Sequence, residues 1–310
     1  MSAPTLVTVK VPATTANLGP GFDCLGAALN CHNLFQFQRL DPSEAHFTIQ
    51  VTGAEAERVS TNASNLAYRA FVHYFQHLGQ SSPRVALQIH LGVPLARGLG
   101  SSATAIVGGL LGANALAGSP LNQAQILDLA IALEGHPDNV APALLGGCYL
   151  AAQGAEQGWT LCPIHWPESI VPVVAIPDFE LSTHSARAVL PSQCDYEAAI
   201  FNAAHLGVLI KALESGNANW LAMALDDRLH QPYRQTLIPS YAAVRQAALE
   251  AGAYGMVISG AGPSLLALCG IEQAAQVATQ MGITWKQAGV QAQVQALALD
   301  LKGAEVTLEA

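Results

Sequence analysis

The 310-residue sequence is poor in charged residues, and lysine is the scarcest of them. Charged residues make up 11% of the chain, only four of them are lysines, and the formal net charge is −9. Proteins that bind nucleic acids neutralise the phosphates with many basic side chains. The composition therefore argues against a nucleic-acid partner, and any anionic ligand must be held by a local site.

Long hydrophobic runs are also missing, although 51% of the residues are hydrophobic. No apolar run reaches the length of a membrane span, and the first residues lack the pattern of a signal peptide. The six cysteines have neither metal-site spacing nor a dense disulfide framework. We therefore expect a cytoplasmic protein with no membrane partner and with reduced cysteines. Cys24, beside Asp23, is either a pocket-lining residue or a reactive thiol.

Residues 94–104 form a glycine loop between a strand and a helix. The alternating aliphatic residues of 85–91 predict the strand, and the small apolar residues after Ser101 predict the helix. The first N–H groups of such a helix lack internal partners and carry partial positive charge. Gly98 and Gly100 allow a phosphate to approach the backbone closely. The pattern predicts a phosphate-binding loop, and its alternative is a plain glycine turn with serine caps.

The loop differs from the two common phosphate-binding motifs. It contains no lysine, which the P-loop uses to reach the outer phosphates. It also lacks the acidic residue that follows a dinucleotide-binding fingerprint after about twenty positions. The sequence therefore predicts a different phosphate-binding geometry.

Three segments resemble the motifs of the GHMP kinases, which phosphorylate galactose, homoserine, mevalonate and phosphomevalonate. They are residues 10–23, residues 94–103 and residues 260–264, and together they span most of the chain. The amino-acid sequences of residues 10–23 and 134–142 are similar to those of the family members that phosphorylate homoserine. The resemblance implies an α+β fold of two domains. Residues 1–160 are expected to resemble ribosomal protein S5 domain 2, and residues 161–310 a ferredoxin-like α/β sandwich.

The resemblance also implies ATP and Mg²⁺ as cofactors. The expected ATP-binding residues are Pro94, Leu95, Ala96, Arg97, Gly98, Leu99, Gly100, Ser101, Ser102, Ala103 and Thr104. Ser102 and Glu134 resemble the metal-binding pair, an assignment that suits the preference of Mg²⁺ for a few oxygen ligands. Asn62 and Asn65 lie where the family contacts adenine, although helix capping alone explains either residue.

On the substrate side, the resemblance implies ATP-dependent phosphorylation of the L-homoserine side-chain hydroxyl, giving O-phospho-L-homoserine for threonine biosynthesis. Because homoserine is a zwitterion, its site needs a cationic and an acidic receptor. Arg187 and Arg234 resemble the carboxylate receptor, and Asn17 and Asp23 the ammonium receptor. The other expected substrate contacts are His136, Asp138, Thr183 and Gly260.

For catalysis, the resemblance implies two residues: Asn139 in an orienting role, and Arg187. Asp138 leaves open whether a general base takes part. A mevalonate-type or isoprenoid kinase is the alternative enzyme, and a non-catalytic ligand sensor is the alternative of another class. The relatives of this family are often homodimers.

Three further expectations concern local structure. Residues 12–21 are dense in turn-forming residues and predict a long loop, which either folds over a substrate or forms a structural crossover. Residues 182–187 form a polar patch. The domain change is expected between residues 155 and 170. His73 and His77 have metal-ligand spacing, but without an accompanying glutamate an ordinary helix face is the simpler interpretation.

Overall fold

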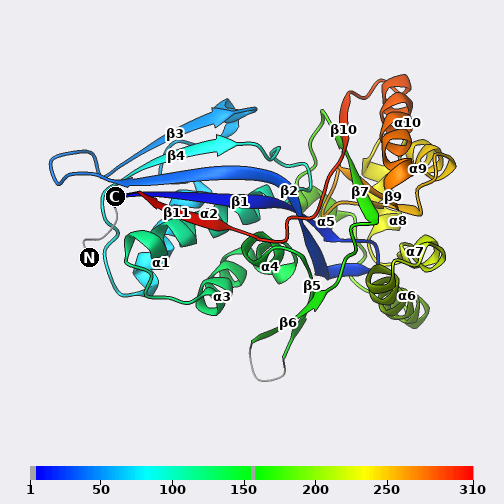
Figure 1. The fold of residues 1–310 in the computed structure, drawn as a ribbon, viewed down its shortest axis with the longest axis horizontal. Coiled ribbons are helices and arrows are strands. Elements are labelled where there is room, and N and C mark those ends of the chain that lie inside the picture. Colours follow the sequence, from blue (N-terminus) through cyan, green and yellow to red (C-terminus); the bar gives the residue numbers. More distant parts are fainter. Residues whose placement is uncertain (1–4, 155–157, 310) are drawn as a thin grey trace.

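The computed structural model describes residues 5–154 and 158–309, which build two β-sheets covered by helices (Figure 1). The first sheet has the order β11-β1-β2-β4-β3, and β5 and β6 extend it from β2. Its strands are β1 (Leu6–Asn17), β2 (Gly21–Arg39), β3 (Phe47–Gly53), β4 (Val85–Leu91), β5 (Cys148–Gln153), β6 (Trp159–Ile164) and β11 (Glu305–Glu309). The second sheet has the order β10-β7-β9-β8. Its strands are β7 (Ile170–Pro177), β8 (Gly255–Ile258), β9 (Leu265–Gly270) and β10 (Ala292–Ala296).

Four helices pack against one face of the first sheet (Figure 1). They are α1 (Leu66–His77), α2 (Ser101–Leu116), α3 (Gln123–Glu134) and α4 (Pro137–Leu145). Helix α2 lies directly on the sheet, with Gly108 and Gly112 against the rings of Phe35 and Phe37. A Cβ atom on either glycine would come within 2.4 or 2.3 Å of these rings. The small residues of α2 allow this close packing, which fixes the direction of its N-terminus.

The second sheet is covered on both faces. Helices α6 (Tyr196–Ser215) and α7 (Ala218–Ala224) share one apolar core with it, and α9 (Tyr241–Glu250) and α10 (Ala274–Gln287) share another. The short helices α5 (Thr183–Ala188) and α8 (Gln231–Arg234) lie near the junction of the two units. Three 3₁₀ turns cover Ala56–Arg58, Gln235–Leu237 and Ile271–Gln273. Among the described residues, none of the helices combines the length and the apolar character that a bilayer span requires.

The predicted long loop over residues 12–21 is wrong. Strand β1 continues to Asn17, β2 begins at Gly21, and the two pair throughout with irregularities after Pro12 and Ala16. The small side chains of this stretch are buried, which allows an extended conformation where turn propensity predicts a loop. The stretch is therefore a β-hairpin, and Asn17 at the end of β1 lines the pocket described below.

The two sheets divide the chain between β6 and β7, inside the interval expected for the domain change. The last strand, β11, pairs with β1 and so returns to the first sheet. Because β6 belongs to the first sheet up to Ile164, we propose a division at residues 165–169, later than the expected boundary at residues 160–161. Residues 305–309 form a strand that the second half contributes to the first unit. The polar patch at residues 182–187 folds largely into helix α5, whose first turn is capped by Ser182.

Candidate functional site

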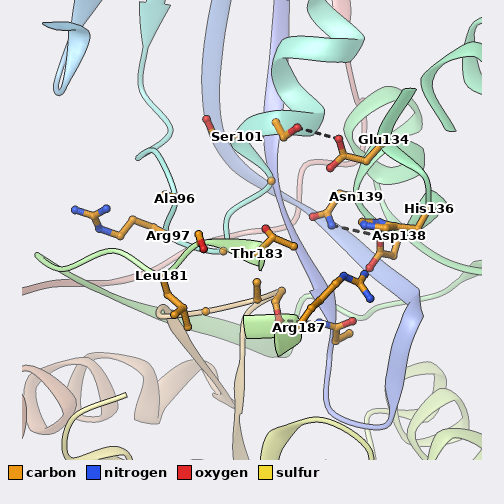
Figure 2. Close-up of a pocket in the computed structure, with 18 of the residues that line it drawn as sticks. Ala96, Arg97, Ser101, Glu134, His136, Asp138, Asn139, Leu181, Thr183 and Arg187 are labelled. Carbon is orange, nitrogen blue, oxygen red and sulfur yellow. Dashed lines mark hydrogen bonds and ion pairs between the residues drawn. The ribbon is translucent and has the colours of Figure 1, made fainter. Parts of the chain in front are cut away.

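A pocket of about 180 Å³ lies where the two units meet (Figure 2). Helices α2, α3 and α4 approach it from the first unit, and α5, α8 and the β8–β9 turn from the second. Its lining residues are Asn17, Asp23, Ala96, Arg97, Gly98, Gly100, Ser101, Ser102, Glu134, His136, Asp138, Asn139, Leu181, Ser182, Thr183, Arg187, Arg234, Gly260, Ala261 and Gly262. The structure thus brings together all the predicted substrate residues, both predicted metal ligands and part of the predicted phosphate loop.

The phosphate loop presents its backbone to the pocket. Gly100 caps α2 in a left-handed conformation with φ 66°, and no side chain caps the helix there. Gly98 has φ 72°, and a Cβ on it would stand 2.2 Å from the carbonyl oxygen of Ser259. Any side chain on Gly98 would therefore push the β8–β9 turn away from the loop. The exposed N–H groups at the start of α2 form a cradle suited to an anion.

Ser102 and Glu134 form an oxygen pair beside this cradle. The Ser102 hydroxyl donates to Oε2 of Glu134 at 2.8 Å, and both residues line the pocket. Burial raises the pKa of Glu134, while the Ser102 hydrogen bond opposes that shift. A divalent cation held by phosphates would balance the charge of this partly buried carboxylate, and Mg²⁺ needs only one or two protein oxygens when phosphates supply others. The donor set therefore fits the expected metal.

At the start of α4, a chain of side-chain contacts fixes Asn139. Its Oδ1 accepts a 2.7 Å hydrogen bond from the hydroxyl of Thr14, and its Nδ2 donates to Oδ1 of Asp138 at 3.3 Å. The same Asp138 oxygen lies 2.6 Å from Nδ1 of His136. This hydrogen bond is the main cause of the raised pKa of His136. Figure 2 shows this cluster between Glu134 on the phosphate side and Arg187, so it places a carboxylate and an oriented amide in the middle of the pocket.

On the opposite side, Asp23 and Arg187 bind each other. The Arg187 guanidinium donates two hydrogen bonds, of 2.9 and 2.8 Å, to the two oxygens of Asp23. Asp23 is held by its own N–H, which donates to Oδ1 of Asn17. The family resemblance implies that Asp23 binds the ammonium group of a substrate and Arg187 its carboxylate. The structure shows the two side chains as an ion pair. Their opposite charges and their neighbouring positions on one side of the pocket explain this contact.

Arg234 is almost completely buried, with 2% of its surface exposed, yet it lines the pocket. Its Nε donates to the carbonyl of Ala186, and its Nη1 donates to the carbonyl of Gly260 and to Nδ1 of His230. Among the described residues, Nη2 has no hydrogen-bond partner. Burial and the nearby Arg187 lower the pKa of Arg234 to about 10. The side chain remains cationic at neutral pH and can accept an anionic ligand.

Several predicted cofactor residues lie outside the pocket lining. Leu99, Ala103 and Thr104 are buried and support the loop. Asn65 caps α1 through Oδ1 and donates to the carbonyl of Ser60, so both ends of its amide are occupied. Pro94, Leu95 and Asn62 also lie outside the pocket lining, and their contacts with a nucleotide stay predictions.

Thr14 and His230 support the site and were not among the residues selected from the sequence. Thr14 lies in the motif at residues 10–23, where Asn17 and Asp23 were chosen for their polarity. His230 stands four residues before Arg234, a spacing that places both side chains on one side of a helical turn. Its Nε2 lies 2.9 Å from the carbonyl oxygen of Gly19, so Nε2 carries the proton and Nδ1 accepts from Arg234. Only that distant contact reveals its function.

Comparison with known proteins identifies the family. Residues 65–147 match the model of the GHMP kinase N-terminal domain, and residues 209–287 match that of the GHMP kinase C-terminal domain. The chain is 63% identical to the homoserine kinase of Trichormus variabilis over 304 residues, which cover 98% of this chain and all of that one.

Solved structures agree with this result. The crystal structure of homoserine kinase from Cytophaga hutchinsonii superposes with a TM-score of 0.90 at 28% identity, covering 99% of both chains. Leishmania major mevalonate kinase shares the fold, with a TM-score of 0.69 at 15% identity and coverage of 96% of this chain and 95% of that one. The chain belongs to the GHMP kinases and, within them, to the homoserine kinase family.

Proposed function

We propose that the protein transfers the γ-phosphoryl group of ATP to the side-chain hydroxyl of L-homoserine, giving O-phospho-L-homoserine and ADP. One observation carries this proposal: two arginines and an aspartate face the anion cradle across one small pocket. High identity to homoserine kinases over the full chain supports the same substrate.

A zwitterionic substrate fits the charges of the pocket. Its carboxylate would accept from Arg234, whose Nη2 is available, and from Arg187. Its ammonium group would donate to Asp23 and to the neighbouring amide oxygen of Asn17. The Asp23–Arg187 pair would then be replaced by two separate pairs with the substrate. Asp23 and Arg187 are partly exposed in the pocket, and a bound substrate would cover them. A substrate with only one charge would then leave one partner of the pair covered without a counter-charge, which is unfavourable.

Phosphoryl transfer depends mainly on alignment and charge neutralisation. ATP supplies the phosphoryl group, and Mg²⁺ neutralises part of the phosphate charge. Ser102 and Glu134 are the residues proposed to hold the metal. The N–H groups of the loop at residues 98–102 would hold the phosphates. Asn139, fixed by Thr14, would orient the acceptor hydroxyl toward them.

In the transfer, the hydroxyl oxygen forms a bond to the γ-phosphorus, and the bond from that phosphorus to the leaving oxygen of ADP breaks. The hydroxyl proton leaves either to a phosphate oxygen or to Asp138. Because Oδ1 of Asp138 is already used by His136 and Asn139, Oδ2 is the oxygen through which a base would act. An Asp138→Asn variant distinguishes the two routes, since loss of a base changes the pH profile of kcat as well as its size.

A coupled assay of ADP release tests the substrate. We expect turnover with L-homoserine and none with mevalonate, whose single carboxylate lacks the ammonium partner for Asp23. Turnover of mevalonate alone would contradict the proposal. Nucleotide binding without transfer to either compound would indicate a ligand sensor.

Two properties of the whole protein are proposed with it. We expect a homodimer, as in many relatives of the family, and light scattering of the purified protein measures this directly. Location in the cytoplasm also stays a prediction, which cell fractionation can test.

A further inference from the structure

Arg97 projects from the phosphate loop in the direction opposite to the pocket. Its backbone lines the pocket, while Figure 2 shows its guanidinium pointing away from the other labelled side chains. The residue is 6% exposed, so a charged group lies buried at the back of the loop. Such burial is unfavourable unless every donor has a partner.

The partners of Arg97 come from three separate segments. Its Nε donates to the carbonyl of Pro177 at 2.9 Å, and its Nη2 donates to the carbonyl of Asp178 at 3.1 Å and to Oε1 of Glu55 at 3.2 Å. Its Nη1 donates to the carbonyl of Leu95 and lies 3.5 Å from Oε1 of Glu180. All three guanidinium nitrogens are used.

These contacts join the two parts of the site. Residues 177–182 lead from the end of β7 into helix α5, which carries Thr183 and Arg187 on the substrate side. The N–H of Leu181 adds a 3.4 Å hydrogen bond to the carbonyl of Ala96. On the other side, Oε2 of Glu55 accepts from the N–H of Leu95 and so holds the start of the loop. One buried side chain, together with the single backbone hydrogen bond from Leu181, therefore ties the phosphate loop to the segment that leads into α5.

We propose that Arg97 is a positioning residue that sets the separation between the phosphoryl donor and the acceptor hydroxyl. This inference rests on the proposed function, because it concerns the alignment of two substrates. An arginine suits the task, since its planar fork directs several hydrogen bonds at fixed angles and a lysine ammonium cannot reproduce them. A displacement of about 1 Å between reacting groups can reduce the rate by about 100-fold.

The test compares Arg97→Lys with Arg58→Lys. Arg58 pairs with the same two carboxylates, Glu55 and Glu180, but at the surface and without contact to the loop or to residues 177–178. Both variants keep the charge. We expect Arg97→Lys to lower kcat by about 10-fold to 100-fold, with less than about threefold change in the Kd of MgADP and of homoserine measured separately. We expect Arg58→Lys to retain the kcat of the wild type. Equal kcat values for all three proteins, or a loss confined to thermal stability, would overturn the proposal.

A second readout does not depend on the substrate. In the wild type, binding of MgADP to the loop should slow amide hydrogen exchange at residues 178–183, because Arg97 connects the two segments. In Arg97→Lys this protection should be lost while protection of the loop itself remains. Protection of residues 178–183 in both proteins would overturn the proposal. Lack of turnover with homoserine in the wild type contradicts the proposed function instead, and the exchange experiment still tests the role of Arg97.

Discussion

The two sides of the pocket are built by different means. The phosphate side consists of backbone N–H groups at the start of α2, a serine and one carboxylate. The opposite side carries Asp23, Arg187 and Arg234, with the His136–Asp138 pair next to them. A backbone cradle depends on close approach, whereas a charged receptor depends on which charges are present. Substitutions on the two sides should therefore impair different steps, nucleotide and metal binding on the phosphate side and homoserine binding on the charged side.

Arg234→Leu is expected to cause the largest effect and to be confined to the charged side. Leucine keeps much of the buried volume but removes the cation and its hydrogen bonds to the carbonyls of Ala186 and Gly260. The carbonyl of Gly260 still accepts from Nδ2 of Asn17. We expect kcat/KM for homoserine to fall by about 1,000-fold, with the Kd of MgADP nearly unchanged. Arg245→Leu, which removes a surface pair with Asp226, serves as the control. Equal losses in the use of homoserine and in the affinity for MgADP would show that Arg234 does not act on homoserine alone.

Glu134→Gln tests the single carboxylate of the phosphate side. The amide keeps the size of the side chain and can still contact Ser102, but it cannot balance a divalent cation. We expect kcat to fall by about 100-fold and the Mg²⁺ concentration needed for half-maximal rate to rise, with homoserine affinity retained. Glu250→Gln, at the exposed end of α9, is the control. An unchanged Mg²⁺ dependence would remove Glu134 from the metal site.

Gly98→Ala tests whether the phosphate loop needs a residue without a Cβ at position 98, apart from the strain of a positive φ. Alanine at a positive φ costs about 1–2 kcal/mol of stability wherever it occurs. Gly79→Ala shares this cost at φ 67°, but a Cβ there meets no atom within 4 Å. Because only Gly98 lies against the carbonyl oxygen of Ser259, we expect about 10-fold weaker MgADP binding in Gly98→Ala alone, measured by calorimetry. Similar binding by both variants would mean that the cradle tolerates a Cβ.

The smallest expected effect is the pH dependence of the His136–Asp138 pair. The pKa of His136 is raised in the folded protein, so its contribution to stability is complete below about pH 6.5 and is lost as pH rises through the raised pKa. One proton limits the slope to about 1.4 kcal/mol per pH unit. We expect the gap in Tm between the wild type and His136→Asn to be larger at pH 6 than at pH 9. A constant gap for His136→Asn would contradict the prediction.

The local elements could be predicted from the sequence, because their signals are local. The strand at residues 85–91 and the start of α2 at Ser101 lie where periodicity and the glycine loop placed them. Helix α5 was missed, since six residues are too few for a helical period to show. Strand β11 was missed because its partner, β1, lies about 300 residues away.

The residues that line the pocket could be predicted, but the contacts between them could not. The family resemblance selected residues that the structure brings into one pocket. It did not reveal that Asp23 binds Arg187, that Thr14 orients Asn139, or that His230 accepts from Arg234. These contacts join residues up to 164 positions apart. Their geometry depends on the packing of the two sheets, for which the sequence has no local pattern.

The pairing of β11 with β1 makes the second unit an insertion within the first. The chain leaves the first sheet once after β6 and comes back to it after β10, so two covalent connections hold the second unit. Opening of the pocket by a hinge must bend both connections together, which restricts the directions in which the units can separate. The first and last strands also end side by side, with Leu6 opposite Glu309. A short linker could therefore join the two ends and allow new termini elsewhere, in a surface turn remote from the pocket.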